Sequence, residues 1–210
     1  GNARRRADRH PLLGQLDPNT KSAFIFNSTL PELQLFQAIL EDFGIVVERR
    51  NKVSMQRQLN AFLMAELAKG NNVILIIDEA QNLKNRVLEE IRMLSNLETD
   101  REKLFQIILV GQPELRHKLS TPELRQLRQR VAVRFHITPL AQDEVGQYID
   151  HRLRVAGSDG GVRFHPDALE FICKYSGGIP RIINMVCDKA LLAAYVMETR
   201  EISRGIIERS

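Results

Sequence analysis

The feature that most constrains this chain is a run of five aliphatic residues that ends in two carboxylates. Val73 to Ile77 contains no polar side chain, and Asp78 and Glu79 follow directly. A strand with one solvated face alternates apolar and polar residues, so this run predicts a central parallel strand covered on both faces. Burial of its side chains contributes roughly 8–15 kcal/mol, at about 1.5–3 kcal/mol each. We therefore expect a layered α/β domain around this strand.

The flanking sequence alternates short apolar runs with helical patterns. The apolar periodicity predicts strands at 23–26, 73–77 and 106–110, and helices at 30–43, 54–69 and 85–97. Ser54 is expected to cap the second of these helices, because a hydroxyl can accept a hydrogen bond from the first helical turn. Strands separated by helices imply right-handed βαβ crossovers and a parallel sheet.

The pattern changes near residue 138. Residues 131–137 alternate apolar and polar side chains, which predicts a last strand with one wetter face. Beyond Pro139, the periodicity predicts helices at 143–156, 166–176, 179–197 and 202–208. We therefore expect an α/β core over residues 1–138 and an all-helical lid over residues 139–210.

Asp78 and Glu79 stand at the end of the predicted central strand. Ligands of open α/β sheets bind beyond the carboxyl ends of the strands. Two adjacent carboxylates are costly there unless a cation compensates them, as Mg²⁺ with a nucleotide phosphate would. In this interpretation Asp78 holds the magnesium ion, mostly through water, and Glu79 orients and polarises the attacking water. Alternatively, the pair offsets the dipole of a following helix, which is worth about 0.3–1 kcal/mol.

Three further polar residues could complete such a site. Gln112 follows the strand at 106–110 and could hydrogen-bond the γ-phosphate or the water, or it could simply belong to a strand-ending turn. Arg130 precedes the strand at 131–137 and could reach a nucleotide in a neighbouring subunit, where such arginines contribute roughly 10³–10⁵ in rate. Arg181 begins the long lid helix, where a positive side chain is disfavoured unless it binds a phosphate. The alternative for both arginines is an exposed, solvated side chain.

Five segments of the chain, in this order, resemble one family. They are Ile-Ile-Asp-Glu-Ala-Gln-Asn-Leu at 76–83, Leu-Ser-Asn-Leu-Glu-Thr at 94–99, Val-Gly-Gln-Pro-Glu-Leu at 110–115, Leu-Arg-Gln-Arg at 127–130 and Gly-Gly-Ile-Pro-Arg-Ile-Ile-Asn at 177–184. They are similar to the AAA+ ATPase domain of the general secretion pathway A protein family of type II secretion, over about residues 17 to 195. The resemblance implies a parallel-sheet P-loop NTPase core with a C-terminal helical lid.

The resemblance also implies roles and partners. It assigns Walker B to Asp78 and Glu79, sensor 1 to Gln112, the arginine finger to Arg130 and sensor 2 to Arg181. It implies a hydrolase that binds ATP and Mg²⁺, associates with itself as a ring or dimer, and serves envelope secretion or pilus assembly proteins. We expect a cytoplasmic protein that reaches the inner membrane, if at all, through parts outside this chain, because no apolar run approaches the ~18 residues that span a bilayer.

The sequence departs from the family at the phosphate-binding loop. A P-loop requires Gly-x-x-x-x-Gly-Lys-Ser/Thr between a strand and a helix. After Gly14, Asn19 stands at the position of the second glycine, and Lys21 with Ser22 comes too late. We therefore expect weak or absent ATP binding by this chain. Our hypothesis is that residues 1–10 are a truncated or mistranslated head in place of the family's first strand and loop.

Two alternative functions remain open. A DNA-associated AAA+ helper of transposition or replication is favoured by the formal net charge of +4, the pI of about 9.3 and the basic helix at 125–130. No helix-turn-helix or added basic domain supports it, and DNA binding that falls steeply with salt would favour it. A non-hydrolysing AAA+ scaffold is favoured by the missing P-loop. Partner binding that survives the substitution Glu79→Gln would support the scaffold.

Overall fold

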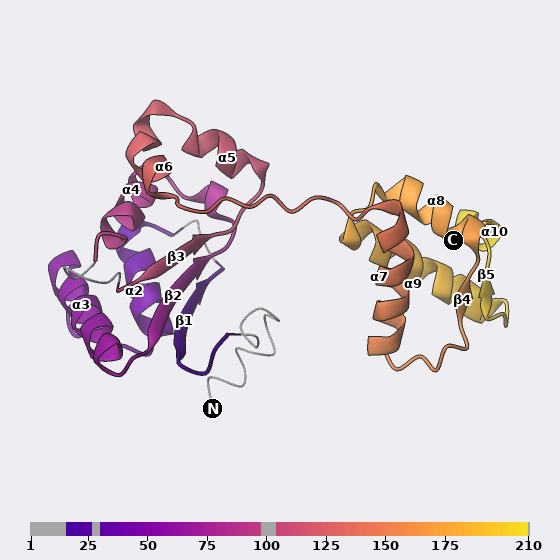
Figure 1. The fold of residues 1–210 in the computed structure, drawn as a ribbon, viewed down its shortest axis with the longest axis horizontal. Coiled ribbons are helices and arrows are strands. Elements are labelled where there is room, and N and C mark those ends of the chain that lie inside the picture. Colours follow the sequence, from indigo (N-terminus) through magenta and orange to yellow (C-terminus); the bar gives the residue numbers. More distant parts are fainter. Residues whose placement is uncertain (1–15, 27–29, 98–103, 210) are drawn as a thin grey trace. The chain divides into compact units, whose positions relative to one another are not determined.

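The computed structural model describes residues 16–26, 30–97 and 104–209, and the chain divides into two compact units (Figure 1). The first unit comprises residues 1–134 and the second residues 135–210. The boundary expected from the sequence, at residue 138, falls close to the start of the second unit. Each unit has its own hydrophobic core and is described by itself.

A parallel sheet organises the first unit. Among the described residues its strands are β1 (Thr20–Ile25), β2 (Asn72–Ile77) and β3 (Gln106–Leu109), in the order β1-β2-β3. Ile77 pairs with Ile25 on one side and with Leu109 on the other, so the three carboxyl ends are level. Every residue of β2 from Val73 onward is buried. The prediction of a central strand that is covered on both faces is therefore confirmed.

Helices connect these strands and cover the sheet. They are α2 (Glu32–Asp42), α3 (Lys52–Ala68), α4 (Asn85–Leu94), α5 (Pro113–Leu119) and α6 (Arg125–Arg130), with the short turns η2 (Ala80–Asn82) and η3 (Pro122–Leu124). Helix α2 packs on β1, and α3 packs on β2 (Figure 1). The predicted cap of α3 is wrong. Asn51 caps this helix by accepting a hydrogen bond from the backbone N–H of Ser54 at 2.8 Å, as an Asn side chain before the first turn commonly does.

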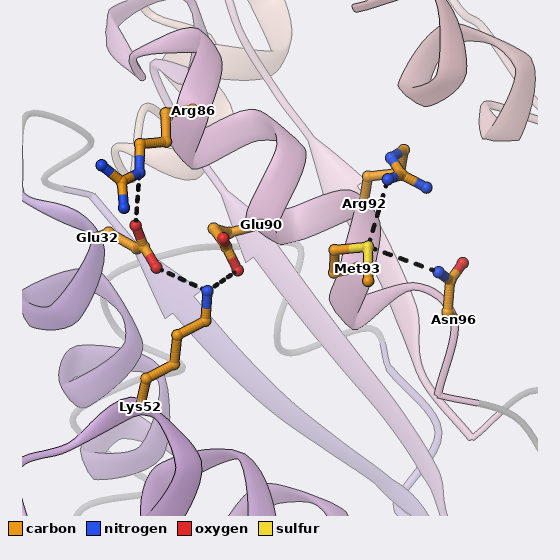
Figure 2. Close-up of polar contacts among 7 residues, drawn as sticks. All are labelled: Glu32, Lys52, Arg86, Glu90, Arg92, Met93 and Asn96. Atoms are coloured by element: carbon orange, nitrogen blue, oxygen red, sulfur yellow. Dashed lines mark hydrogen bonds and ion pairs between the residues drawn. The ribbon is translucent and has the colours of Figure 1, made fainter.

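Lys52 joins three helices of the first unit. Figure 2 shows its Nζ between the carboxylates of Glu32 on α2 and Glu90 on α4. Nζ lies 2.9 Å from Oε1 of Glu32 and 2.6 Å from Oε2 of Glu90. Nε of Arg86 lies 3.2 Å from the other oxygen of Glu32. A lysine at the first position of a helix is disfavoured by the helix dipole, and the two carboxylates offset that cost. The hydrogen bond to Glu90, followed by the one to Glu32, raises the pKa of Lys52 above its ordinary value of 10.5.

We expect this network to contribute to stability up to a strongly alkaline pH. Because the pKa is higher in the folded chain than in the unfolded one, the contribution is intact below the unfolded pKa and is lost as the pH rises through the folded pKa. When the pH rises from about 9.5 to about 11.5, the unfolding free energy of the unsubstituted chain should fall. The unfolding free energy of the Lys52→Met variant should fall by about 0.5–1 kcal/mol less. Urea titrations at these pH values measure the difference. An equal effect of Lys84→Met, which removes an exposed lysine, would contradict the assignment.

The predicted strand at 131–137 is wrong. This segment has no regular secondary structure, and Val133, Phe135 and Ile137 are 83%, 88% and 81% exposed. Alternating apolar residues favour an extended backbone, but a strand also needs a neighbouring strand to satisfy its N–H and C=O groups. In the parts of the chain that the structure describes, no strand pairs with this segment or with the outer edge of β3.

The second unit is a helical cluster with one small sheet. Its helices are α7 (Gln142–Val155), α8 (Pro166–Ser176), α9 (Pro180–Val196) and α10 (Arg204–Glu208). The predicted helices all occur, but the unit is not entirely helical, because β4 (Arg163–Phe164) and β5 (Glu201–Ile202) pair in parallel. Two-residue strands are too short to leave a periodic signal in the sequence. Within the described ranges of both units, no helix has the length and apolar composition that crossing a bilayer requires.

Candidate functional site

The carboxyl ends of the three parallel strands carry the candidate site. The backbone N–H of Asp78 donates to the carbonyl of Ile25 at 2.9 Å, so β2 stays bonded to β1 just past its last residue. On the other side, the N–H of Val110 donates to the carbonyl of Ile77 at 2.9 Å. Asp78 is therefore held by a backbone that both neighbouring strands fix. Rigid elements of this kind hold functional groups more accurately than loops do.

The backbone turns sharply at Glu79. Its φ of 51° and ψ of 36° lie in the left-handed region, which costs a residue with a side chain roughly 1–2 kcal/mol. Two hydrogen bonds offset this cost. Oδ1 of Asp78 accepts from the N–H of Glu79 at 2.8 Å, and the N–H of Ala80 donates to the carbonyl of Val110 at 2.9 Å. Strain that the surroundings impose in this way is common at functional sites.

Two glutamines hold the carboxylate of Glu79. Its Oε2 accepts a hydrogen bond from Nε2 of Gln81 at 2.6 Å and from Nε2 of Gln112 at 3.3 Å. Oε1 of Gln81 in turn accepts from the backbone N–H of Gln112 at 3.2 Å. A Cβ on Gly111 would lie 2.6 Å from this oxygen, so the glycine leaves room for it. Gln112, at the end of the neighbouring strand, therefore lies within hydrogen-bond distance of Glu79.

Lys118 fixes the segment that follows Glu79. From α5, its Nζ donates to the backbone carbonyl of Gln81 at 2.9 Å and also to the carbonyl of Leu83. Neither Gln81 nor Lys118 is among the site residues expected from the sequence. The spacing of Gln81, two residues beyond Glu79, could have drawn attention to it. The contact of Lys118 with backbone carbonyls leaves no pattern in the sequence.

The two arginines singled out in the sequence lie at helix ends. Arg130 is the exposed last residue of α6, which packs against α4. Arg181 is the exposed second residue of α9, in the second unit. Gly178 precedes that helix with a φ of +76°, and a Cβ there would lie 2.1 Å from the backbone oxygen of Leu140. Asp78, Glu79 and Gln112 therefore lie close together in the first unit. Arg181 lies in the second unit, at a helix start that the close packing of Gly178 against Leu140 holds in place.

The described residues fit one part of a magnesium–nucleotide site. Mg²⁺ in phosphate-binding enzymes is held by one or two carboxylates, several waters and the substrate phosphates. Asp78, half-buried at a strand end, offers such a carboxylate, and the described ranges hold no cluster of three or more acidic, His or Cys side chains that would form a closed metal cage. Lys21 and Ser22 lie inside β1, paired with Val73 and Ile74, so they do not form a phosphate-binding loop. Gly14 and the head at 1–10 are outside the described residues.

Comparison with known proteins gives consistent matches. A family model described as an AAA domain matches residues 8–119. General secretion pathway protein A of Aeromonas hydrophila is 43% identical over 197 residues, covering 93% of this chain and 36% of that protein. This chain thus spans little more than a third of that relative.

Solved structures of other proteins share the fold. The ORC2 protein of Aeropyrum pernix, in its ADP form, has a TM-score of 0.66 at 16% identity, covering 99% of this chain and 55% of that one. The RuvB Holliday junction branch migration motor of Thermotoga maritima has a TM-score of 0.52 at 17% identity, covering 99% and 67%. At such identities the likeness concerns the fold alone.

Proposed function

This chain belongs to the AAA-domain family as a relative of general secretion pathway protein A, and from that premise we propose that it is an ATP-hydrolysing module that energises assembly of a type II secretion or related envelope complex. The expected fold class is confirmed, since an AAA-domain family model matches residues 8–119 and the first unit is built on a parallel sheet. The envelope complex comes from the relative's name and stays part of the proposal.

The observation that carries the proposal is the meeting of Glu79 and Gln112 beyond β2 and β3. In our proposal Asp78 holds Mg²⁺, mostly through water, and the bound ion would neutralise charge on the phosphates. Glu79 orients and polarises the attacking water, as a carboxylate within hydrogen-bond reach of that water can. Gln112 directs its side-chain amide to the γ-phosphate or to the water.

The arginines extend this proposal beyond one subunit. Arg130 is exposed at the end of a helix, which suits a side chain that reaches the nucleotide of a neighbouring copy. We therefore propose self-association into a ring or dimer, with Arg181 contacting a phosphate from the second unit. The proposed partners are envelope secretion or pilus assembly proteins. The proposed place is the cytoplasm, or the inner membrane through parts outside this chain.

We expect this chain to bind ATP weakly, because Lys21 and Ser22 are strand residues instead of parts of a phosphate cradle. If the dissociation constant for ATP is about 5 mM or higher, then ATP at about 5 mM with Mg²⁺ stabilises the fold by at most about 0.4 kcal/mol. The melting temperature should then rise by no more than about 1–2 °C, as for any ligand effect this small. Differential scanning calorimetry, with AMP and Mg²⁺ as the ionic control, measures this. A melting temperature that rises by several degrees with ATP and Mg²⁺, but not with AMP and Mg²⁺, would contradict weak ATP binding.

A second candidate function is a non-hydrolysing AAA+ scaffold. The strand conformation of Lys21 and Ser22 favours it, because these two residues then hold no phosphate, whereas the fold can still offer its surfaces to partners. The two functions differ in what Glu79→Gln does. If the scaffold is correct, co-purification with envelope assembly proteins persists in the variant, and the unsubstituted chain shows no ATP turnover.

A further inference from the structure

We propose that Gln81 is a positioning residue that sets the orientation of the Glu79 carboxylate, and that Gln112 is the partner which this carboxylate releases during the reaction cycle. The orientation of the Glu79 carboxylate is a property of the structure of the site, whereas the effect of that orientation on ATP turnover rests on the proposed function. Neither the family match nor the sequence motifs assign a role to Gln81. The inference follows from how two amides share one carboxylate oxygen.

The two hydrogen bonds to Oε2 of Glu79 differ in length. The donor of Gln81 lies 2.6 Å away, whereas the donor of Gln112 lies 3.3 Å away. N–H···O hydrogen bonds in proteins cluster near 2.9–3.0 Å and weaken as they lengthen, so Gln81 makes the tighter contact. Gln112 makes the contact that a competing anion can replace most easily. A phosphate oxygen beyond β3 would be such a competitor, because it is a charged acceptor like the carboxylate and could form a hydrogen bond shorter than the present 3.3 Å.

Gln81 is itself held from three directions. Its Nε2 donates to Glu79, its Oε1 accepts from the backbone N–H of Gln112, and its backbone carbonyl accepts from Lys118. Gly111 leaves the space that Oε1 occupies. The side chain therefore links the turn after β2 to the start of α5. When Gln112 turns away, Glu79 keeps the contact with Gln81 and so keeps its orientation.

An amide of this length can donate to Glu79 and accept from Gln112 at the same time. Gln81→Glu preserves the oxygen that accepts from Gln112 but replaces the donor to Glu79 with a second carboxylate. The two carboxylates would then repel one another at hydrogen-bond distance. Gln81→Ala removes both the donor and the acceptor. Comparing the two variants therefore separates orientation of Glu79 from simple support of the turn.

The first measurement is structural and needs no nucleotide. In heteronuclear NMR spectra, the side-chain amide signals of Gln112 and the backbone amide of Glu79 should shift in both Gln81 variants. Gln147→Glu, an equivalent change at an exposed glutamine of α7, should leave these signals in place. Unchanged Gln112 and Glu79 signals in Gln81→Glu would overturn the inference.

The second measurement is kinetic. Gln81→Glu should lower kcat for ATP hydrolysis roughly 10- to 100-fold, as small misplacements of a catalytic group do, with KM changed less than about two-fold. Its melting temperature should stay closer to that of the unsubstituted chain than the melting temperature of Gln81→Ala does. Full kcat in Gln81→Glu would overturn the positioning role. If the unsubstituted chain shows no turnover, the proposed function fails, whereas the NMR result still decides the orientation.

Discussion

Replacing Glu79 with glutamine is expected to lower kcat for ATP hydrolysis by about 10²–10⁴, the range in which a positioned general base contributes. The substituted side chain has nearly the same shape, and its oxygen can still accept the 2.6 Å hydrogen bond from Gln81. It carries no negative charge, so it polarises the attacking water far less. Phosphate release at ATP concentrations up to the millimolar range measures the change, because we expect weak binding by this chain.

The control for this substitution is Glu114→Gln. Glu114 is an exposed carboxylate in the first turn of α5, and its replacement removes the same charge from the same unit. Although Glu114 lies two residues beyond Gln112, its side chain is exposed, so we expect turnover by this variant within about two-fold of that of the unsubstituted chain. If turnover by Glu79→Gln also stays in that range, Glu79 does not activate the water.

Replacing Gly178 with alanine is expected to destabilise the second unit by about 3 kcal/mol or more. The left-handed backbone at this position costs a residue with a Cβ roughly 1–2 kcal/mol. The added methyl group would also lie 2.1 Å from the backbone oxygen of Leu140, so the backbone itself has to move. That movement weakens the hydrogen bond from the N–H of Leu140 to the carbonyl of Gly178, now 2.9 Å long. The helix start that holds Arg181 would shift with it.

Gly177→Ala is the matched control for this prediction. Gly177 also has a left-handed backbone, with a φ of +57°, but a Cβ there meets no described atom within 4 Å. We expect a loss of about 1–2 kcal/mol, which is the backbone cost alone. Chemical denaturation followed by far-UV circular dichroism suits a chain without tryptophan. Equal losses in the two variants would show that the contact with Leu140 does not limit this position.

The sequence was most informative where one physical requirement dominated. Five aliphatic residues in a row have few stable locations, so the central position of β2 could be predicted. Because neighbouring parallel strands end level, Gln112 could be expected near the end of β2 if the two strands are neighbours, and the structure places it against Glu79. The magnesium, arginine-finger and phosphate roles remain predictions, since they concern ligands and neighbouring subunits.

The sequence was least informative where two residues could fill the same role, or where a contact depends only on the path of the backbone. Asn51 and Ser54 are both good caps, and only the backbone geometry shows that Asn51 accepts the hydrogen bond. Segment 131–137 alternates apolar and polar residues as a strand does, but this alternation does not show whether a neighbouring strand is available for pairing. The hydrogen bonds of Gln81 and Lys118 depend on a left-handed turn at Glu79, which nothing in the local sequence requires.

The exposed apolar side chains of segment 131–137 bear on how the protein behaves at high concentration. Val133, Phe135 and Ile137 recur at every second position, and no described strand of the same chain pairs with them. An extended, apolar and unpaired stretch of this kind is a template for β-pairing between molecules, which leads to aggregation. Arg130 and Arg134 oppose that association by placing like charges on approaching copies. Salt screens this repulsion, so the chain should remain dispersed best in buffers of low ionic strength.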